Sequence, residues 1–169
     1  TTSIVEQIFY NRGFSTKEDI QHYLNLTQND DLGFDNIDNL HKGAQILIKH
    51  IAAGNKIFIQ VDPDVDGYTS AAILINYLHR LFPETTEQNI YYRIQDGKEH
   101  GLILDSIAKD VFKLVIAPDS SSNEYDIHKK KKNAGIDVLV IDHHNAEKVS
   151  EDACVINNQM CDYPTKTLS

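Results

Sequence analysis

The spacing of apolar residues changes near residue 55. Before that point, apolar positions recur every three or four residues, which predicts amphipathic helices over residues 2–14, 15–24 and 36–55. Ser and Thr residues with an acid three positions later mark the first two helix starts, and Gly13 and Gly54 mark helix ends. We therefore expect a helical N-terminal segment over residues 1–54, packed on the domain that follows it.

After residue 55, short β-branched runs alternate with helical stretches. The expected strands are 56–61, 89–94, 113–117, 137–141 and 153–157, and the expected helices are 67–82, 101–111 and 123–135. The strands are almost continuously apolar, which is typical of strands covered on both faces. This alternation predicts an α/β domain over residues 55–169, with a mostly parallel sheet and helices on both faces.

The composition agrees with a folded domain. The chain has 169 residues, 41% of them hydrophobic and 24% charged, with a formal net charge of −9. An acidic chain does not coat nucleic acid unspecifically, although a local basic patch or bound cations can still provide a binding surface. Nothing in it reads as a signal peptide or a membrane span, and its two cysteines are expected to be free thiols, so we expect a cytoplasmic protein.

Acidic residues follow three of the expected strands. Asp62, Asp64 and Asp66 come directly after 56–61, Asp119 follows 113–117, and 137–141 runs into Asp142-His143-His144. Because the carboxyl ends of parallel strands share one edge of the sheet, these side chains should converge there.

Five carboxylates and two imidazoles in one crevice require a counter-charge. Oxygen-rich sites with one or two imidazoles suit Mn²⁺ or Mg²⁺, whereas structural zinc favours cysteine. So many donors suggest two ions that share a carboxylate, the arrangement used for displacement at phosphorus. We also expect Gly67 to open the following helix, with its N–H groups facing the crevice.

Each motif taken alone has a simpler interpretation. The stretch DPDVDG resembles a turn or half of a calcium loop, although Ile73 stands where an EF-hand requires glutamate. Asp119 alone is compatible with a helix cap, and DHH alone is a short match. The metal interpretation depends on all three motifs occurring at strand ends in this order.

The ordered motifs DPDVDGYTS, APDSSS and VIDHHN resemble those of the DHH phosphoesterase superfamily. The stretches NRGFSTKEDIQHYL and ACVINNQMCDYPTKTLS narrow the resemblance to the RecJ-type single-stranded-DNA exonucleases. Gln60 stands where many small-molecule members have histidine, and Asp62 matches the extra aspartate of the RecJ type. The APDSSS stretch departs from the RecJ pattern because it lacks a glycine there.

The resemblance implies a role for each site residue. Asp64 and Asp119 would hold one ion, with support from Asp62, while Asp66, Asp119 and His143 would hold the other. Asp142 would belong to the metal site by orienting the histidine ligand. His144 would touch the scissile phosphate or assist the leaving group. The expected catalytic set is Asp66, Asp119, His143 and His144, and the expected metal set is Asp62, Asp64, Asp66, Asp119, Asp142 and His143.

Substrate contacts are expected just beyond strand 89–94. Arg93, Lys98 and His100 follow the sheet edge and are candidates to grip a nucleic-acid phosphate together with His144, against the simpler interpretation of a polar loop. Tyr91 and Tyr92 alternate on a strand, so at least one belongs to the core. The lysine run within 128–133 is typical of a solvated helix face.

The resemblance predicts a Mn²⁺-dependent exonuclease that degrades single-stranded DNA, 5′ to 3′, in repair, recombination or replication. Two alternatives stay open: a phosphodiesterase of short oligonucleotides or cyclic dinucleotides, and a non-catalytic replication scaffold. Single-strand-binding or replication proteins are candidate partners. The family continues into a fourth aspartate motif and a second domain, so we expect this chain to be the N-terminal part of a larger nuclease and a poor enzyme alone.

Overall fold

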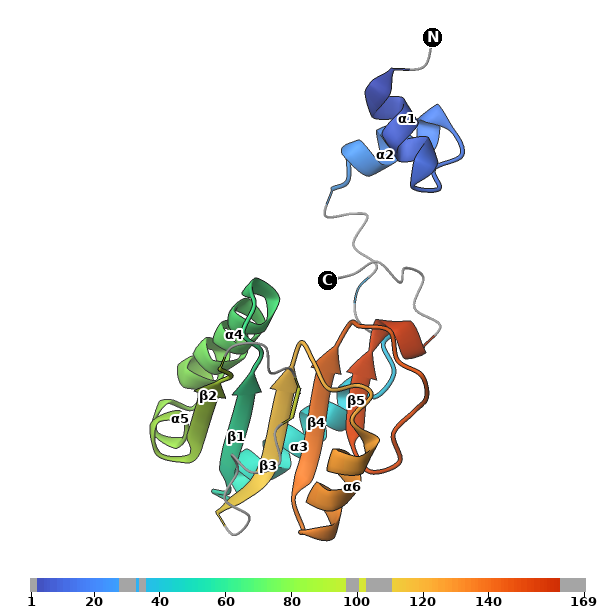
Figure 1. Ribbon diagram of the computed structural model, residues 1–169. Helices are drawn as coiled ribbons and strands as arrows, with labels where there is room; N and C mark the ends of the chain where they lie inside the picture. The colour runs from blue at the N-terminus through green and yellow to red at the C-terminus, as the bar shows by residue number, and fades with distance from the viewer. Residues whose placement is uncertain (1–2, 28–32, 34–35, 97–100, 103–110, 162–169) are drawn as a thin grey trace. The chain divides into compact units, whose positions relative to one another are not determined.

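The computed structural model describes residues 3–27, 33, 36–96, 101–102 and 111–161 (Figure 1). It divides into two compact units, Thr1–Gly33 and Phe34–Ser169. The two units have separate folds.

The first unit consists of two short helices with matching starts. Helix α1 (Ile4–Asn11) begins with a capping box between Ser3 and Glu6, and α2 (Lys17–Leu24) begins with one between Thr16 and Asp19. The reciprocal bonds satisfy backbone N–H groups that the first turn of a helix leaves without partners. Three aromatic rings with centroids 5.1–5.8 Å apart hold the pair together: Phe9, Phe14 and Tyr23. The expected helix starts are confirmed.

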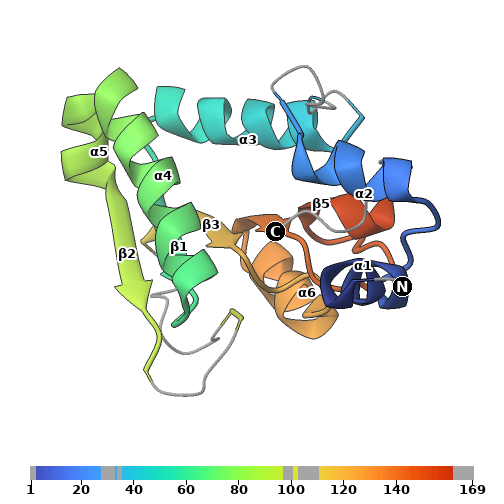
Figure 2. The ribbon, with the colours of Figure 1, turned by 90° about the horizontal axis from the view of Figure 1, so that it is seen from above.

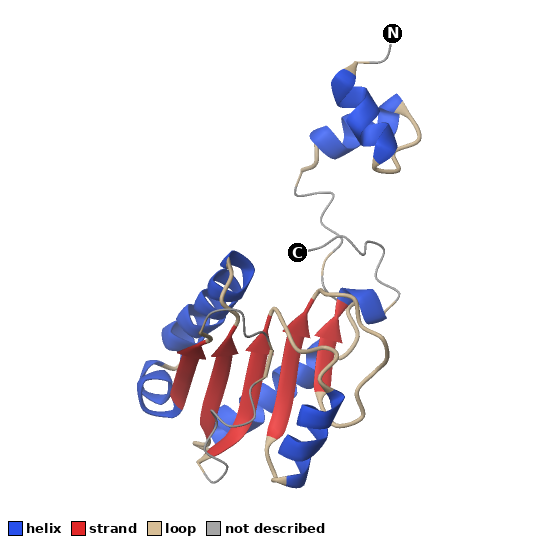
Figure 3. Ribbon diagram, viewed as in Figure 1, coloured by secondary structure: helices blue, strands red, loops and turns tan. Residues whose placement is uncertain are grey.

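The second unit is built on a five-stranded sheet in the order β2-β1-β3-β4-β5, in which every pairing is parallel (Figure 3). The strands are β1 (Lys56–Val61), β2 (Ile90–Ile94), β3 (Phe112–Pro118), β4 (Asp137–Asp142) and β5 (Cys154–Asn157). All five predicted strands are therefore present, and the predicted α/β class with a parallel sheet is confirmed.

Helices cover both faces of this sheet. They are α3 (Leu40–Ala52), α4 (Val65–Leu81), α5 (Pro83–Asn89), α6 (Tyr125–Asn133) and the 3₁₀ helix η2 (Asn158–Met160). Helices α3 and α6 lie on opposite sides (Figure 2). Helix α5 was not expected; it begins with Pro83 at its first position, where a missing N–H costs nothing. The expected helix over 101–111 falls mainly outside the described residues.

The core consists of one apolar layer on each face. Ile57, Ile59 and Ile116 are fully buried against side chains of α3 and α4. On the other face, Val115 and Val140 are fully buried beneath α6. The central strands are thus buried on both sides, which explains their almost continuously apolar sequence.

Helix α3 packs directly on the sheet. A Cβ atom at Gly43 would lie 2.6 Å from Cδ1 of Ile156 and 2.9 Å from Cδ1 of Leu139, so glycine allows the helix to approach β4 and β5 closely. Helix α3 belongs to the unit Phe34–Ser169. The predicted domain limit at residue 54 remains a prediction for the whole protein. No helix in the described part of the chain is long and apolar enough to cross a membrane.

Candidate metal centre

The strand-end residues meet at one edge of the sheet, as the sequence predicts. A cavity of about 390 Å³ lies at the carboxyl ends of β1, β3 and β4. Its lining comprises Asp62, Asp64, Gly101, Asp119, Ser120, Ser121, Ser122, Asn123, Glu124, Asp142 and His144. Because the strands are parallel, residues far apart in sequence come together there.

Helix α4 begins earlier than expected. Asp64 is its N-cap residue, and its side chain accepts a hydrogen bond of 2.9 Å from the backbone N–H of Gly67. The prediction that Gly67 opens the helix is therefore wrong, because Val65 and Asp66 already form the first turn. The capping aspartate satisfies one N–H and adds negative charge at the helix N-terminus.

Gly67 allows this helix to begin against the acidic loop. A Cβ atom at position 67 would lie 2.5 Å from the backbone oxygen of Asp62 and 2.7 Å from its Cβ. Only glycine permits such a close approach without movement of the backbone. Asp62, with 4% of its surface exposed, is thereby held beneath the start of α4.

Two groups of donor atoms share Asp119. Ligand atoms of Asp62, Asp64 and Asp119 all lie within 4.8 Å of one another, and so do those of Asp119, His143 and His144. Asp66 is exposed in the first turn of α4 and belongs to neither group, although its charge helps to raise the pKa of Asp119. Among the described residues, Asp119 is thus the one member that the two groups have in common.

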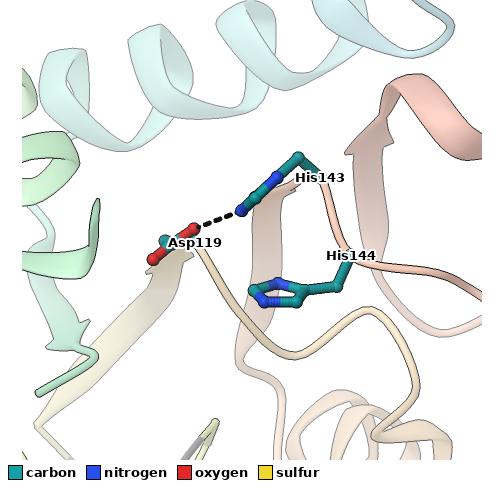
Figure 4. Close-up of side chains that lie close together, drawn as sticks. All are labelled: Asp119, His143 and His144. Carbon is teal, nitrogen blue, oxygen red and sulfur yellow. Dashed lines mark ion pairs between the residues drawn. The ribbon is translucent and has the colours of Figure 1, made fainter. Parts of the chain in front are cut away.

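Asp119 is held in an unusual backbone conformation. Its φ angle of 67° lies in the left-handed region, which non-glycine residues rarely adopt. Nε2 of His143 lies 3.0 Å from Oδ1 of Asp119, as the dashed line in Figure 4 marks. The pair does not have hydrogen-bond geometry, and among the described residues neither His143 Nε2 nor Asp119 Oδ2 has a hydrogen-bonding partner. Burial and the charge of Asp64 raise the pKa of Asp119 to about 6.

These observations fit a divalent cation. Buried polar atoms without a hydrogen-bonding partner are rare, and at this site they are a carboxylate oxygen and an imidazole nitrogen of two side chains that point toward each other. A carboxylate-rich donor set with imidazoles suits Mn²⁺ or Mg²⁺. The residues that could hold such ions are Asp62, Asp64, Asp119 and His143, with His144 close by.

Asp142 belongs to neither donor group and accepts hydrogen bonds instead. Its Oδ2 accepts from the backbone N–H of Ser122 at 3.0 Å, and its Oδ1 accepts from the backbone N–H groups of His143 and His144 and lies 2.8 Å from Nδ1 of His144. Burial alone would raise the pKa of Asp142, but the bonds from Ser122 and His144 outweigh it and lower that pKa. The pKa of His144 is raised, chiefly by its bond to Asp142.

Sequence reasoning missed Asn157, which closes this network. Its Nδ2 donates to Ser122 Oγ at 2.8 Å and to the backbone oxygen of His144 at 2.9 Å, and only 2% of the residue is exposed. Asn157 therefore ties the loop after β3 to the turn after β4. The available signal was its place at the end of the fifth expected strand, where the other strands also carry site residues.

The candidate substrate residues are only partly described. Arg93 lies on edge strand β2, next to β1, and Nη2 of its guanidinium is 3.5 Å from Oδ2 of Asp96. Lys98 and His100 lie outside the described residues. Tyr91 packs its ring edge-on against Phe112, with centroids 5.4 Å apart. Tyr91 is nevertheless 41% exposed and Tyr92 61% exposed, so the prediction that at least one of them belongs to the core is wrong. The reason is that β2 is an edge strand, exposed along most of its length.

Comparison with known protein families gives a match over the part of the chain that forms the sheet. The profile of the DHH family, N-terminal domain, matches residues 56–167. The chain belongs to the DHH family. The match covers all five strands and every strand-end residue described above.

The curated relatives of this DHH chain are described as exonucleases. It is 45% identical over 163 residues to the putative SPbeta prophage-derived single-strand DNA-specific exonuclease YorK of Bacillus subtilis (strain 168). It is 26% identical over 176 residues to the single-stranded-DNA-specific exonuclease RecJ of the same organism. These matches span 96% and 99% of this chain but only 27% and 22% of the two relatives.

Solved structures show the same fold. RecJ from Thermus thermophilus in complex with Mn²⁺ superposes with a TM-score of 0.66 at 21% identity, covering 94% of this chain and 22% of that one. An exonuclease RecJ bound to manganese gives a TM-score of 0.65 at 21% identity, covering 82% and 34% of the two chains. The DHH fold of the second unit is therefore shared with both.

Proposed function

We propose that this chain is the metal-binding part of an exonuclease that degrades single-stranded DNA with the help of two Mn²⁺ ions. The observation that carries the proposal is the pair of donor groups that share Asp119, in a DHH-family chain whose relatives are described as single-strand DNA-specific exonucleases. The Mn²⁺-bound RecJ structures support manganese as the cofactor, with Mg²⁺ as the second choice. Cleavage from 5′ to 3′ rests on the family resemblance.

Each site residue has a place in this proposal. Asp62, Asp64 and Asp119 would hold one cation, and Asp66, Asp119 and His143 the other. When bound, the cations would lower the pKa of a water molecule and neutralise charge on the attacked phosphoryl group. Asp66 is exposed in this structure, so its part in the second site rests on the family resemblance.

In this proposal His144 acts on the substrate directly. Asp142 is ionised and accepts the proton of His144 Nδ1, so that Nε2 carries any proton that reaches the substrate. The raised pKa of His144 increases the fraction of imidazolium near neutral pH. A charged imidazole at this place contacts a phosphate oxygen or protonates a leaving oxygen.

Gln60 favours a nuclease over a small-molecule phosphodiesterase. It is fully buried, and its Nε2 donates to the backbone oxygen of Arg93 at 3.2 Å. The position that carries histidine in many small-molecule members thus links β1 to the edge strand β2.

Degradation assays with the full-length protein test the proposal. Single strands labelled at the 5′ or 3′ end, the matching duplex and the matching RNA are incubated with Mn²⁺, Mg²⁺ or chelator. We expect Mn²⁺-dependent release of mononucleotides from single-stranded DNA, beginning at the 5′ end. Asp119→Ala should abolish it, whereas Asp126→Asn, which removes an exposed charge in the first turn of α6, should not. Equal degradation of duplex DNA, or activity in chelator, contradicts the proposal.

We expect the 169-residue chain by itself to be a poor nuclease. It spans about a quarter of its curated relatives, 27% of YorK and 22% of RecJ. Assaying this chain beside the full-length protein, at equal Mn²⁺ and DNA concentrations, measures what the remaining residues contribute.

A further inference from the structure

Residues 101 and 102, between β2 and β3, form backbone hydrogen bonds with three side chains at the candidate metal centre: Asp62, Gln95 and Glu124. The backbone N–H of Gly101 donates to Oδ1 of Asp62 at 3.3 Å, and the Gly101 oxygen accepts from Nε2 of Gln95. The backbone N–H of Leu102 donates to Oε2 of Glu124 at 2.7 Å. Residues 101 and 102 therefore bring a hydrogen-bond donor to a carboxylate of the first donor group.

Glu124 and Gly101 fit closely. Gly101 has a φ angle of 77°, and a Cβ atom there would overlap Oε1 of Glu124. The glycine thus supplies both a left-handed conformation and the space that the carboxylate occupies. The side chain of Leu102, only 2% exposed, anchors the segment in the apolar core beneath α6.

Glu124 is also bonded to the loop that carries Asp119. Burial raises the pKa of Glu124, while the N–H of Leu102 and the hydroxyl of Ser121 oppose that rise. Ser121 has a φ angle of 84°, in the left-handed region that residues other than glycine rarely adopt. One carboxylate thus connects the 101–102 segment, the loop after β3 and the start of α6.

We propose that Glu124 is a positioning residue that holds Gly101 against Asp62 and so fixes the Asp62 carboxylate in the metal centre. Glu124 does not belong to either donor group. Its length places the acceptor oxygen at Leu102, and this keeps the N–H of Gly101 within hydrogen-bonding distance of Asp62 Oδ1, so that the Asp62 carboxylate stays close to Asp64 and Asp119. The inference rests on the proposed metal site but not on the identity of the nucleic acid.

Two substitutions separate position from charge. Glu124→Gln keeps the length and an acceptor oxygen but removes the charge. Glu124→Asp keeps the charge but is one methylene too short to reach the N–H of Leu102. If Glu124 acts by position, Gln should preserve Mn²⁺ binding and Asp should weaken it; if it acts only by its negative charge, the order reverses. Asp126→Asn is the matched control, since it removes a charge from the first turn of the same helix.

Mn²⁺ alone is the probe, titrated into the full-length protein and followed by the electron paramagnetic resonance of free Mn²⁺. We expect the dissociation constant of the tighter site to rise about tenfold in Glu124→Asp and to stay within about threefold of the parent in Glu124→Gln and Asp126→Asn. Thermal unfolding of each metal-free variant, followed by circular dichroism, identifies a temperature at which all four proteins are folded, and the Mn²⁺ titrations are carried out there. With saturating Mn²⁺, kcat should recover in Glu124→Asp, because the cation compensates for the poorly oriented ligand.

Equal affinities in the four proteins, or weaker binding by Glu124→Gln than by Glu124→Asp, overturn the inference. A lower melting temperature with unchanged Mn²⁺ affinity does so as well, because it assigns Glu124 a structural role alone. If the parent binds Mn²⁺ and the predicted order holds but single-stranded DNA is not degraded, the proposed nuclease function fails and the positioning role stands.

Discussion

Nδ1 of His144 lies 2.8 Å from Oδ1 of Asp142, which is the last residue of β4 and stands two positions before His144. Three further N–H groups, from Ser122, His143 and His144, point at the same carboxylate. Asp142 is therefore ionised and fixed, and it holds the imidazole of His144 in one orientation and one tautomer.

Asp142→Asn should lower kcat of the full-length enzyme about 10- to 100-fold, the usual effect of losing a residue that orients a functional histidine. The amide cannot accept as strongly, so the pKa of His144 should fall toward its ordinary value. NMR titration of the His144 ring measures that fall. Asp137→Asn is the control, because it breaks a comparable pair, His50 Nε2 to Asp137 Oδ2 at 2.9 Å, where β4 begins. Equal kcat in the two variants contradicts the role of Asp142.

The raised pKa of Asp119 predicts how the Mn²⁺ affinity depends on pH. Burial and Asp64 raise the pKa of this residue to about 6 in the metal-free protein. A cation needs the ionised carboxylate, so protons compete with it and the Mn²⁺ affinity should fall as the pH drops below about 6. Titrations between pH 5 and 8, at constant ionic strength, measure the slope. An affinity independent of pH across that range contradicts the prediction.

In the metal-free protein, the raised pKa of Asp119 makes the folded state less stable as the pH rises. A carboxyl whose folded pKa lies above its unfolded value, 3.8, favours folding when protonated, so its contribution is lost as the pH rises from about 4 to about 6. Asp119→Asn should therefore stabilise the metal-free protein at pH 7 by about 1 kcal/mol, after allowance for solvent screening. Urea unfolding at pH 4 and pH 7 measures this, and the difference should vanish at the lower pH. The control is Asp126→Asn.

Arg93 is the described candidate for a phosphate contact outside the metal centre. Its side chain is 42% exposed and pairs with Asp96, which is 92% exposed, so the guanidinium can exchange this partner for a phosphate. Arg93→Gln should weaken binding of single-stranded DNA and reduce the salt slope by about 0.7, the value for one phosphate contact. Arg80→Gln, in the last turn of α4, is the control. An unchanged slope contradicts the contact, and the same assay tests Lys98 and His100.

The sequence was informative wherever side-chain type alone determines structure. Buried strands are almost continuously apolar, as β3 is from Leu114 to Pro118, and acids directly after such parallel strands had to meet at one edge. Backbone geometry was harder to foresee. Within the APDSSS stretch, where the resemblance led us to expect a glycine, Ser121 adopts a φ angle of 84°. The loop thus contains a conformation typical of glycine that no glycine signals in the sequence. Asn157 acts through hydrogen bonds to residues 35 and 13 positions away, and no local pattern predicts such bonds.

Gly67 and Gly43 allow close packing in different parts of the second unit. Replacing each of them with alanine should distinguish effects on stability from effects on metal binding. At Gly67 a Cβ would meet the backbone oxygen of Asp62 at 2.5 Å, so the start of α4 must move away from the acidic loop. At Gly43 it would meet only the ends of the Ile156 and Leu139 side chains, which can shift. Overpacking of this kind typically costs about 1–3 kcal/mol, and we expect both variants to lose stability on that scale.

The two variants should differ in metal binding, because only Gly67 touches the loop that carries Asp62 and Asp64. Mn²⁺ affinity should fall about tenfold or more in Gly67→Ala, since movement of α4 displaces two ligands of the first donor group. In Gly43→Ala it should stay within about twofold of the parent. Urea unfolding and Mn²⁺ titration of the same preparations give both quantities. Should Gly67→Ala bind Mn²⁺ as tightly as Gly43→Ala, the close approach of α4 to Asp62 serves only packing, and the first donor group does not depend on it.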